Sequence, residues 1–430
     1  MLQKLRNLAT RSRSHRALAP LLRACHQLVS ERGQASVYAL SQEVMTLYRE
    51  LPPTERVAFF AALATDFAPR PQEVLASAMQ FSRAQTADTL AALTRAVEPP
   101  RQELLRRINR APGGTAALLA MRCDLLGLIA EQPELRAVDA DFLHLLASWF
   151  NPGFLRLETV NWQSSAALLE KIIRHEAVHE ITGWDDLRRR LQPDRRCYAF
   201  FHPQLGDDEP LIFVEVALVE EIPATIAQLI DAPAAAALTG SARTAVFYSI
   251  SNCQPGLRGV SLGNFLIKKV ADHLCAELPQ LRTFCTLSPV PGFTRWLGEA
   301  TAHPPQGAWR PPLERVQTWR QSQGTVGSAA LAALSDDLRN DLCALCAHYL
   351  VAHSHGPQAD PVARFHLDNG ARLERVNFAA DLSRKGLKQS LGMMVNYLYD
   401  LDSVERRHQQ FIDGEVSHAM AVRRQLRPAA

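Results

Sequence analysis

A glycine-rich loop over residues 252–262, followed directly by a predicted helix, has the composition of a phosphate-binding site. Its glycines, with the one just after it, stand at positions 256, 259 and 263. Glycine lets a backbone come close to a ligand, and the first turn of a helix offers unpaired N–H groups at the positive end of its dipole. Positive charge nearby comes from Arg258, Lys268 and Lys269. The pattern predicts a cradle for a pyrophosphate, and a glycine-rich turn without a ligand is the alternative.

The run His175-Glu176-Ala177-Val178-His179 matches the His-Glu-x-x-His helix of zinc peptidases. In that helix two histidines four residues apart share one face and bind the metal, while the glutamate acts as a base. No histidine follows at the further spacing, and Gly183 and Trp184 are expected to end the helix soon after. We therefore favour a helix with two ordinary histidines, although a glutamate further along could still complete a zinc site.

Two other groups of potential metal ligands occur near residue 350. Cys343 and Cys346 form a Cys-x-x-Cys, but no second pair stands near them and they fall within a predicted helix over 338–350. We expect both thiols to fill a hydrophobic core rather than to act in redox chemistry or metal binding. His348, His353 and His355 have no carboxylate interleaved, and a solvated loop after the helix is the favoured interpretation.

The elements that must position these groups differ between the two parts of the chain. Up to about residue 150, apolar residues at three- and four-residue spacing predict helices over 37–51, 57–67, 73–93, 101–110, 115–131 and 139–149. Pro52 and Pro53 end one helix and begin the next. No fixed repeat period connects the helices, so a bundle is expected rather than a solenoid. Asn151-Pro152-Gly153 is the most plausible domain boundary.

Beyond that boundary, short runs of β-branched and aromatic residues predict strands over 197–201, 211–219, 244–251 and 282–287. An amphipathic helix is predicted over 264–278, between the last two strands. Strands that alternate with helices indicate an α/β or α+β second domain. Loops are predicted over 303–307 and 321–328.

The 430 residues are 47% hydrophobic and 21% charged, which is typical of a globular chain with two or three domains. A net charge of +3 gives no strong field for nucleic acid or a membrane surface. No apolar stretch reaches the roughly 18 residues of a spanning helix. Eight scattered cysteines suit a reducing compartment better than a disulfide scaffold.

The first 30 residues carry several basic side chains and no acidic one. This composition is that of a mitochondrial presequence. The alternative, which we favour, is a basic first helix of the folded domain.

Several motifs together carry a resemblance to a known family. The run from Arg258 to Gly263 resembles the CoA pyrophosphate loop of the N-acetyltransferase (GNAT) superfamily, with Ser261 in place of the middle glycine. Further motifs lie before and after this loop in matching order: His202-Pro-Gln-Leu-Gly, Glu209-Pro-Leu-Ile-Phe-Val-Glu-Val-Ala-Leu218, Phe247-Tyr-Ser-Ile-Ser251, Leu287-Ser288-Pro-Val-Pro-Gly-Phe293, Phe365-His366-Leu-Asp-Asn-Gly-Ala371 and Met394-Val-Asn-Tyr397-Leu-Tyr399. From about residue 150 to 400, the chain resembles the malonyl-CoA decarboxylase family.

The resemblance implies an α-helical N-terminal bundle over residues 1–155, used in oligomerisation, and an α/β, GNAT-like catalytic domain over 156–430. It implies a homotetramer, a dimer of dimers, that acts on malonyl-CoA in fatty acid metabolism. No cofactor or metal is expected, and the charge and hydropathy above argue against a nucleic-acid or membrane partner. The expected location is the cytoplasm of a bacterium, or the mitochondrial matrix if the source is eukaryotic.

The same resemblance implies which residues form the site. Ser288 and His366 are the expected catalytic pair, and Tyr399 is a weaker candidate for substrate binding. The expected CoA-loop residues are Arg258, Gly259, Val260, Ser261, Leu262, Gly263 and Asn264. Mammalian members of the family carry Glu where Ser261 stands, which puts a polar role of that position in doubt.

Loss of CO2 from malonyl-CoA leaves an enolate that the thioester itself stabilises, so no metal or organic cofactor is needed. The protein must bind CoA, donate hydrogen bonds to the enolate oxygen and supply a proton to C2. His366 could be the acid or a donor, and a tight turn expected at Asp368-Asn369-Gly370 would place it near the end of a strand. Ser288 could bind the leaving carboxylate or the thioester, or relay a proton.

Two other functions stay open at this point. A GNAT acyltransferase would move acetyl from acetyl-CoA to an amine. A non-catalytic acyl-CoA-binding regulator would bind malonyl-CoA without turning it over.

Overall fold

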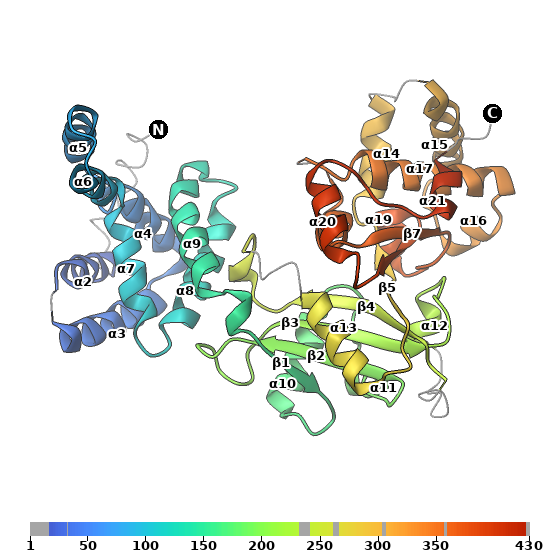
Figure 1. The fold of residues 1–430 in the computed structure, drawn as a ribbon, viewed down its shortest axis with the longest axis horizontal. Helices are drawn as coiled ribbons and strands as arrows, with labels where there is room; N and C mark the ends of the chain where they lie inside the picture. Colours follow the sequence, from blue (N-terminus) through green and yellow to red (C-terminus); the bar gives the residue numbers. More distant parts are fainter. Residues whose placement is uncertain are drawn as a thin grey trace. The chain divides into compact units, whose positions relative to one another are not determined.

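Two compact units make up the chain (Figure 1). The first comprises residues 1–156 with 201–209 and 254–262, and the second comprises the rest. The computed structural model describes residues 17–31, 33–231, 241–260, 266–302, 307–356 and 359–426. Most of the basic N-terminal segment, residues 1–16, therefore lies outside the described residues. Within the described ranges, no helix has both the length and the apolar character needed to cross a membrane.

The first unit is helical, as the apolar periodicity predicts. Its helices are α2 (Leu18–Ser30), α3 (Gln34–Glu50), α4 (Pro53–Thr65), α5 (Pro71–Arg83), α6 (Ala87–Val97), α7 (Pro100–Asn109), α8 (Gly114–Leu128) and α9 (Arg136–Trp149), with 3₁₀ turns η1 (Pro133–Leu135), η2 (Pro152–Phe154) and η3 (Pro255–Leu257). Helices α4, α5 and α7 each begin with proline, which lacks the N–H that a first turn would leave unpaired.

The single helix predicted over 73–93 is wrong, because α5 ends at Arg83 and α6 begins at Ala87. Thr86 caps the new helix. The Thr86 hydroxyl accepts a hydrogen bond from the backbone N–H of Thr89. In return, the Thr89 hydroxyl accepts one from the backbone N–H of Thr86. This reciprocal cap starts a helix without proline or glycine, so the apolar spacing alone conceals the break.

The second unit is built on a mixed sheet that has eight strands among the described residues. They are β1 (Arg156–Val160), β2 (Arg195–Phe201), β3 (Pro210–Val219), β4 (Thr244–Asn252), β5 (Thr283–Thr286), β6 (Ser288–Pro289), β7 (Arg372–Asn377) and β8 (Met394–Tyr399). The strand order is β1-β2-β3-β4-β5-β8-β6, and β7 pairs with β8. The four predicted strands are confirmed as β2 to β5. Strand β3 is buried along nearly its whole length, which explains its almost uninterrupted apolar sequence.

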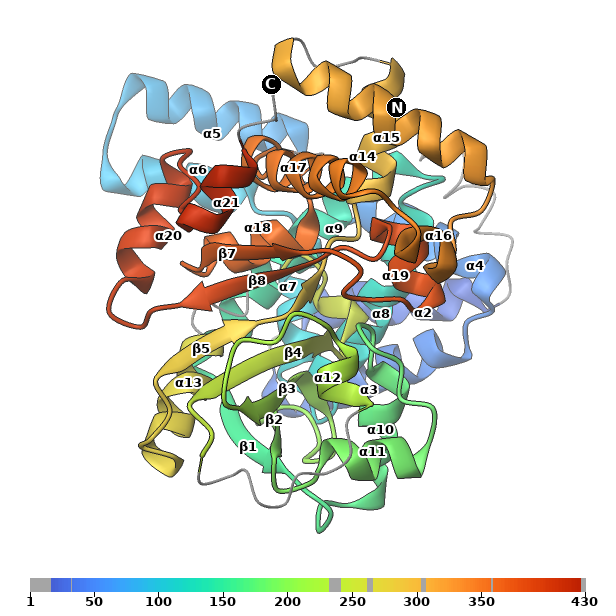
Figure 2. The same cartoon turned by 90° about the vertical axis from the view of Figure 1, so that its right-hand side faces the viewer.

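Helices cover this sheet and join its strands. They are α10 (Ala166–His175), α11 (Trp184–Arg190), α12 (Ala227–Ile230), α13 (Leu266–Glu277), α14 (Phe293–Ala302), α15 (Arg310–Gln323), α16 (Ser328–Ala332), α17 (Asp336–Ala352), α18 (Pro361–Asp368), α19 (Arg384–Ser390), α20 (Val404–Ile412) and α21 (Met420–Gln425), with the 3₁₀ turn η4 (Gly307–Trp309). Helix α17 contacts β7 from one face (Figure 2). The loop predicted over 321–328 is shorter than expected, because α15 continues to Gln323 and α16 begins at Ser328.

Strands β4 and β5 are parallel, and their pairing is short. It runs from Thr244 opposite Thr283 to Phe247 opposite Thr286, whereas β4 itself continues to Asn252. The N–H of Leu287 still donates to the carbonyl oxygen of Phe247 at 3.2 Å. The chain then leaves β4, and Ser288 pairs with Val395 of β8. The point where these two strands part is thus where the Ser288 motif begins.

Candidate active site

Ser288, His366 and Tyr399 lie in one buried, hydrogen-bonded cluster of the second unit. The Oγ atom of Ser288 lies 3.0 Å from Nε2 of His366. On the other side of the ring, Nδ1 of His366 lies 2.8 Å from the Tyr399 hydroxyl. The three side chains are no more than 5% exposed. Residues 111 positions apart in sequence therefore form a continuous chain of polar groups.

Each member of this cluster comes from a different element. Ser288 is held in β6 by pairing with β8, and Tyr399 is held at the other end of β8 by pairing with Phe284 of β5. His366 lies in the last turn of α18, not near the end of a strand as expected. The segment Asp368-Asn369-Gly370 ends that helix instead of turning between strands. A Cβ on Gly370 would lie 2.1 Å from the carbonyl oxygen of Val404, and its φ is +75°, so this position requires glycine.

The imidazole of His366 is neutral in the free protein. Burial lowers the pKa of His366 to about 3, because a charged ring would lose its hydration there. The ring stacks on Tyr397, with 4.7 Å between the ring centres. Burial also raises the pKa of Tyr399 well above its usual range, so its hydroxyl stays protonated.

Two proton arrangements satisfy this cluster. In one, Ser288 donates to Oγ1 of Thr286 at 2.9 Å, His366 donates from Nε2 to Ser288, and Tyr399 donates to Nδ1. In the other, Ser288 donates to Nε2 and the Nδ1–H of His366 donates to Tyr399. The two arrangements differ in the tautomer of His366 and in the rotation of the hydroxyl groups. Ser288 therefore accepts a hydrogen bond from Nε2 in the first arrangement and donates one to Nε2 in the second, and every group stays neutral in both.

Asp360, which none of the sequence motifs includes, connects the segments of Ser288 and His366. Its Oδ1 accepts from the backbone N–H groups of Val362 and Ala363, which caps α18. Its Oδ2 accepts from the backbone N–H of Gly292 at 2.8 Å, four residues after Ser288. The side chain is 1% exposed, and its burial raises the pKa of Asp360. An Asp before Pro361 is a helix-start signal that could have located the cap but not its link to Gly292.

Comparison with known proteins identifies the family. The C-terminal domain of malonyl-CoA decarboxylase matches residues 153–430, and its N-terminal domain matches residues 67–150. The chain belongs to the malonyl-CoA decarboxylase family. The mitochondrial malonyl-CoA decarboxylases of Anser anser anser and Rattus norvegicus are 38% and 37% identical to it. These alignments cover 71% of this chain and 64% and 67% of those relatives, so the chain spans about two thirds of their length.

Two solved structures of the family are also similar. The malonyl-CoA decarboxylase from Rhodopseudomonas palustris is 47% identical, with a TM-score of 0.88, and covers 94% of this chain and 98% of its own. The one from Agrobacterium vitis is 44% identical, with a TM-score of 0.83, and covers 94% of this chain and 99% of its own. Both likenesses extend over the helical unit and the mixed α/β sheet.

Only part of the CoA loop expected for a malonyl-CoA decarboxylase falls within the described residues. Arg258, Gly259 and Val260 belong to the first unit. The other four expected loop residues, Ser261, Leu262, Gly263 and Asn264, lie outside the described residues. Gly259 has a φ of +81°, which a side chain would strain.

Gly256 contacts helix α8, whereas its spacing predicts a role in a phosphate-binding loop. A Cβ there would lie 2.4 Å from the carbonyl oxygen of Leu119 in α8. Arg122, also in α8, donates from Nη1 to the Gly256 carbonyl oxygen at 2.8 Å. This glycine therefore lets the loop pack on a helix rather than on a ligand.

The helix expected around the His-Glu-x-x-His pattern is wrong. Helix α10 ends at His175, so His175 and His179 do not share a helix face. Both carboxylate oxygens of Glu176 are engaged: one accepts from the backbone N–H groups of Val178 and His179, and the other from the Ser249 and Ser251 hydroxyls. Among the residues that the structure describes, no cluster of three or more potential metal ligands occurs.

The Cys-x-x-Cys lies in α17, as expected. Cys346 is buried and Cys343 is partly buried, and burial raises the pKa of both thiols, to about 11 for Cys343. Both thiols therefore stay protonated near neutral pH, as expected of core residues.

The solvated loop expected for the three histidines is wrong for two of them. His348 lies within α17 and stacks on Trp309 at 4.2 Å between ring centres, and His353 packs against Trp296 at 5.5 Å. Only His355 is exposed, and its Nε2 lies 2.9 Å from the Phe411 carbonyl oxygen. The aromatic residues that bind these rings lie some 40 and more positions away, so local sequence does not reveal them.

Proposed function

We propose that this chain is an active malonyl-CoA decarboxylase, a carbon–carbon lyase that forms acetyl-CoA and CO2, with Ser288 and His366 as its catalytic pair. The observation that carries the proposal is the buried 3.0 Å contact between the Ser288 hydroxyl and His366. Membership of the family and the names of the bacterial and mitochondrial relatives support it. A bacterial cytoplasm, or a mitochondrial matrix in a eukaryote, would suit the same relatives.

The reaction needs hydrogen-bond donors more than it needs a charged acid. When the bond between C2 and the carboxylate breaks, its electron pair moves into the thioester carbonyl and makes an enolate. Donors held in place beforehand stabilise that oxygen at little reorganisation cost. The Ser288 hydroxyl and the Nε2–H of a neutral His366 are two such groups in a water-poor site, and either could face the developing charge.

After CO2 has left, C2 of the enolate must receive a proton from a group close to Ser288 and His366. His366 is neutral in the free protein, but malonyl-CoA brings a carboxylate with it. A negative charge beside an imidazole favours the imidazolium form and raises its pKa. We infer that binding of the substrate draws a proton onto His366, which then passes to C2 directly or through Ser288. The Tyr399 hydroxyl, next to Nδ1, holds the ring in the required orientation.

We propose a GNAT-like arrangement for CoA. Parting of the parallel strands β4 and β5 after Phe247 supports it, because β4 then has backbone groups without a β5 partner that could bind the pantetheine chain. The phosphates would lie at residues 258–264, where Gly259 has a left-handed backbone and Arg258 supplies charge.

We also propose that the helical unit mediates self-association to a tetramer, a dimer of dimers. Helices α5 and α6 pack on one another as a hairpin at one edge of this unit (Figure 1), and neither has a buried residue. Their apolar side chains Leu75, Met79, Leu90 and Val97 are 46–63% exposed. An apolar hairpin of this kind is typical of an interface. Leu75→Glu should lower the mass measured by light scattering, whereas Glu73→Gln on the same helix should not.

The decisive test of the activity is simple. Purified protein is incubated with malonyl-CoA and EDTA, without any amine, and CO2 and acetyl-CoA are followed. We expect both products at a rate that EDTA does not change. Binding without turnover would favour the regulator, and a requirement for an amine would favour the acyltransferase. Loss of activity in EDTA with recovery in zinc would favour metal chemistry.

Isotope labelling tests the enolate. In D2O, freshly dissolved malonyl-CoA whose C2 protons have not exchanged should give acetyl-CoA with a single deuterium in its methyl group. Mass spectrometry of the acetyl group measures this. A methyl group without deuterium would mean that the proton comes from the substrate itself, which contradicts delivery by His366.

A further inference from the structure

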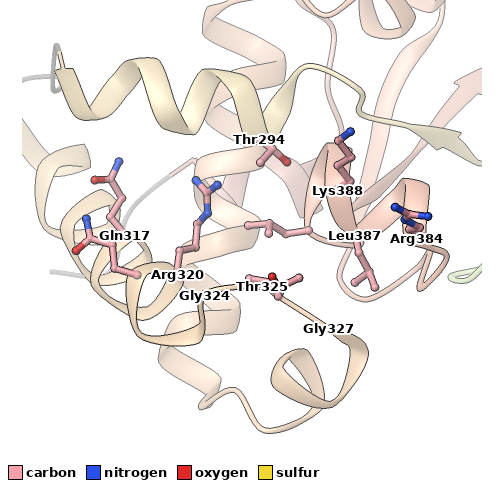
Figure 3. Close-up of a pocket in the computed structure, with 12 residues that line it drawn as sticks. Thr294, Gln317, Arg320, Gly324, Thr325, Gly327, Arg384, Leu387 and Lys388 are labelled. Atoms are coloured by element: carbon pink, nitrogen blue, oxygen red, sulfur yellow. The ribbon is translucent and has the colours of Figure 1, made fainter.

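A cavity lies in the C-terminal part of the second unit, and none of the site residues above lines it. Its volume is about 800 Å³, within the usual size range of small-molecule sites. Figure 3 shows its walls: Arg320 enters from α15 on one side, Arg384, Leu387 and Lys388 come from α19 on the other, and Thr294 of α14 lies between them. Residues 324–327, which join α15 to α16, close the lower edge.

The charge of this cavity is of one sign. Three cationic side chains line it, Arg320, Arg384 and Lys388, and its lining includes no Asp or Glu. Within the described ranges, none of the three forms an ion pair or a side-chain hydrogen bond. Arginines elsewhere on α15 differ, since Arg310 pairs with Glu314 and Arg315 pairs with Asp341. Among the described residues, the cavity thus brings together three cationic side chains that have no counterion.

Arg320 is a cation in this cavity that has lost part of its hydration without gaining a counterion from the part of the chain that the structure describes. Its side chain is partly buried, and that burial lowers its pKa because no carboxylate offsets the lost hydration. Thr294 adds a second unsatisfied group: its hydroxyl oxygen is shielded from solvent and has no hydrogen-bond partner. A buried hydroxyl without a partner costs free energy that a bound acceptor could recover. Both groups point to a ligand with negatively charged oxygens.

We propose that this cavity binds a small organic anion with two or more phosphate or carboxylate groups. Three cations on opposite walls suit more than one charged group, and guanidinium groups bind planar or tetrahedral oxyanions with paired hydrogen bonds. Leu387, Leu391 and Val326 complete the lining and offer contact to an apolar part of the ligand. The phosphates of CoA and those of another metabolite share this chemistry, so the experiment must separate the two sources.

The test is direct binding to the full chain, so it does not depend on decarboxylase activity. Pyrophosphate and citrate are titrated by calorimetry at constant ionic strength, set with NaCl. Loss of one charge-assisted hydrogen-bonding group should weaken binding by about tenfold or more. We therefore expect this loss in Arg320→Gln and in Lys388→Gln, and near-normal binding in Arg320→Lys. The matched control is Arg310→Gln on the same helix, which lies outside the cavity and should bind normally.

Competition with CoA then assigns the source. If CoA displaces pyrophosphate from the wild type, and Arg320→Gln weakens CoA as well, the phosphates of CoA occupy the cavity. If CoA binds without displacing pyrophosphate, the cavity serves a separate anion. Thermal unfolding without ligand checks that each variant is folded. No saturable binding of either probe to the wild type, or equal affinity in all variants, would overturn the proposal.

Discussion

A neutral, buried His366 predicts a specific dependence of stability on pH. The unfolded chain exposes this imidazole, whose pKa is then about 6.5. In the folded protein its pKa is about 3. Below pH 6.5 the unfolded state therefore binds a proton that the folded state excludes. The stability that this residue contributes is complete above pH 6.5, and it is lost progressively as the pH falls toward 3.

The size of the effect follows from the same pKa difference. Each pH unit within this window costs about 1.4 kcal/mol in the free energy of unfolding. Between pH 7 and pH 5, His366 alone should therefore cost about 2 kcal/mol. Urea unfolding at pH 7, 6 and 5 measures how the free energy of unfolding of the wild type changes with pH. The same series on His366→Gln lacks the contribution of His366, because glutamine does not titrate. The difference between the two slopes belongs to His366.

Other histidines titrate in the same window and provide a control. Burial lowers the pKa of His348 to about 4, so His348→Gln should also flatten the slope. That residue is outside the candidate site, and its variant should keep decarboxylase activity while His366→Gln loses it. Equal slopes for the wild type and His366→Gln would mean that His366 is charged or solvated in the folded protein. The mechanism built on a neutral ring would then be refuted.

Three further substitutions test the site and the loop. Ser288→Ala removes one donor at the reacting end and should lower kcat by about 10²–10³-fold, with little change in the affinity for CoA measured by calorimetry. Tyr399→Phe leaves Nδ1 of His366 without its partner and should lower kcat, while Tyr198→Phe, whose hydroxyl bonds Glu277 instead, should not. Gly259→Val forces a side chain into a left-handed backbone and should raise KM for malonyl-CoA more than it lowers kcat. Unchanged steady-state constants in any of the three would contradict the role given to that residue.

Much of the fold follows from local patterns. Helices α3, α7, α8 and α9 bury one apolar stripe each, and α4 buries apolar residues on every side. Strands β2 to β5 are runs of buried residues, so periodicity and composition are enough to find these elements. Strands β6 and β7 give no such signal. β6 has two residues, and β7 carries charged side chains and an irregularity between Leu373 and Arg375. Both strands form by pairing with β8, which lies between them, and a local sequence pattern does not predict this pairing.

The candidate site shows the same division. Motifs are enough to name Ser288, His366 and Tyr399, and the structure brings the three together. Motifs do not show that His366 ends a helix, or that its burial keeps the ring neutral. Both depend on residues far away in sequence, such as Val404 against Gly370 and Tyr397 against the imidazole.

Asp360 is the position where this dependence can be tested most sharply, because it holds the segments of both Ser288 and His366 without contacting either side chain. One carboxylate oxygen caps the helix of His366, and the other accepts from Gly292 behind Ser288. Asp360→Asn keeps the shape but turns an NH2 group toward at least one backbone N–H, which leaves a buried donor unsatisfied at a cost of about 1–3 kcal/mol. We expect urea unfolding to show this loss, and kcat to fall while CoA affinity holds. Asp336→Asn, in the first turn of α17 and exposed, is the control for removing a carboxylate. A destabilised Asp360→Asn protein with wild-type kcat would show that the carboxylate supports the fold alone, and that the spacing of Ser288 and His366 does not depend on it.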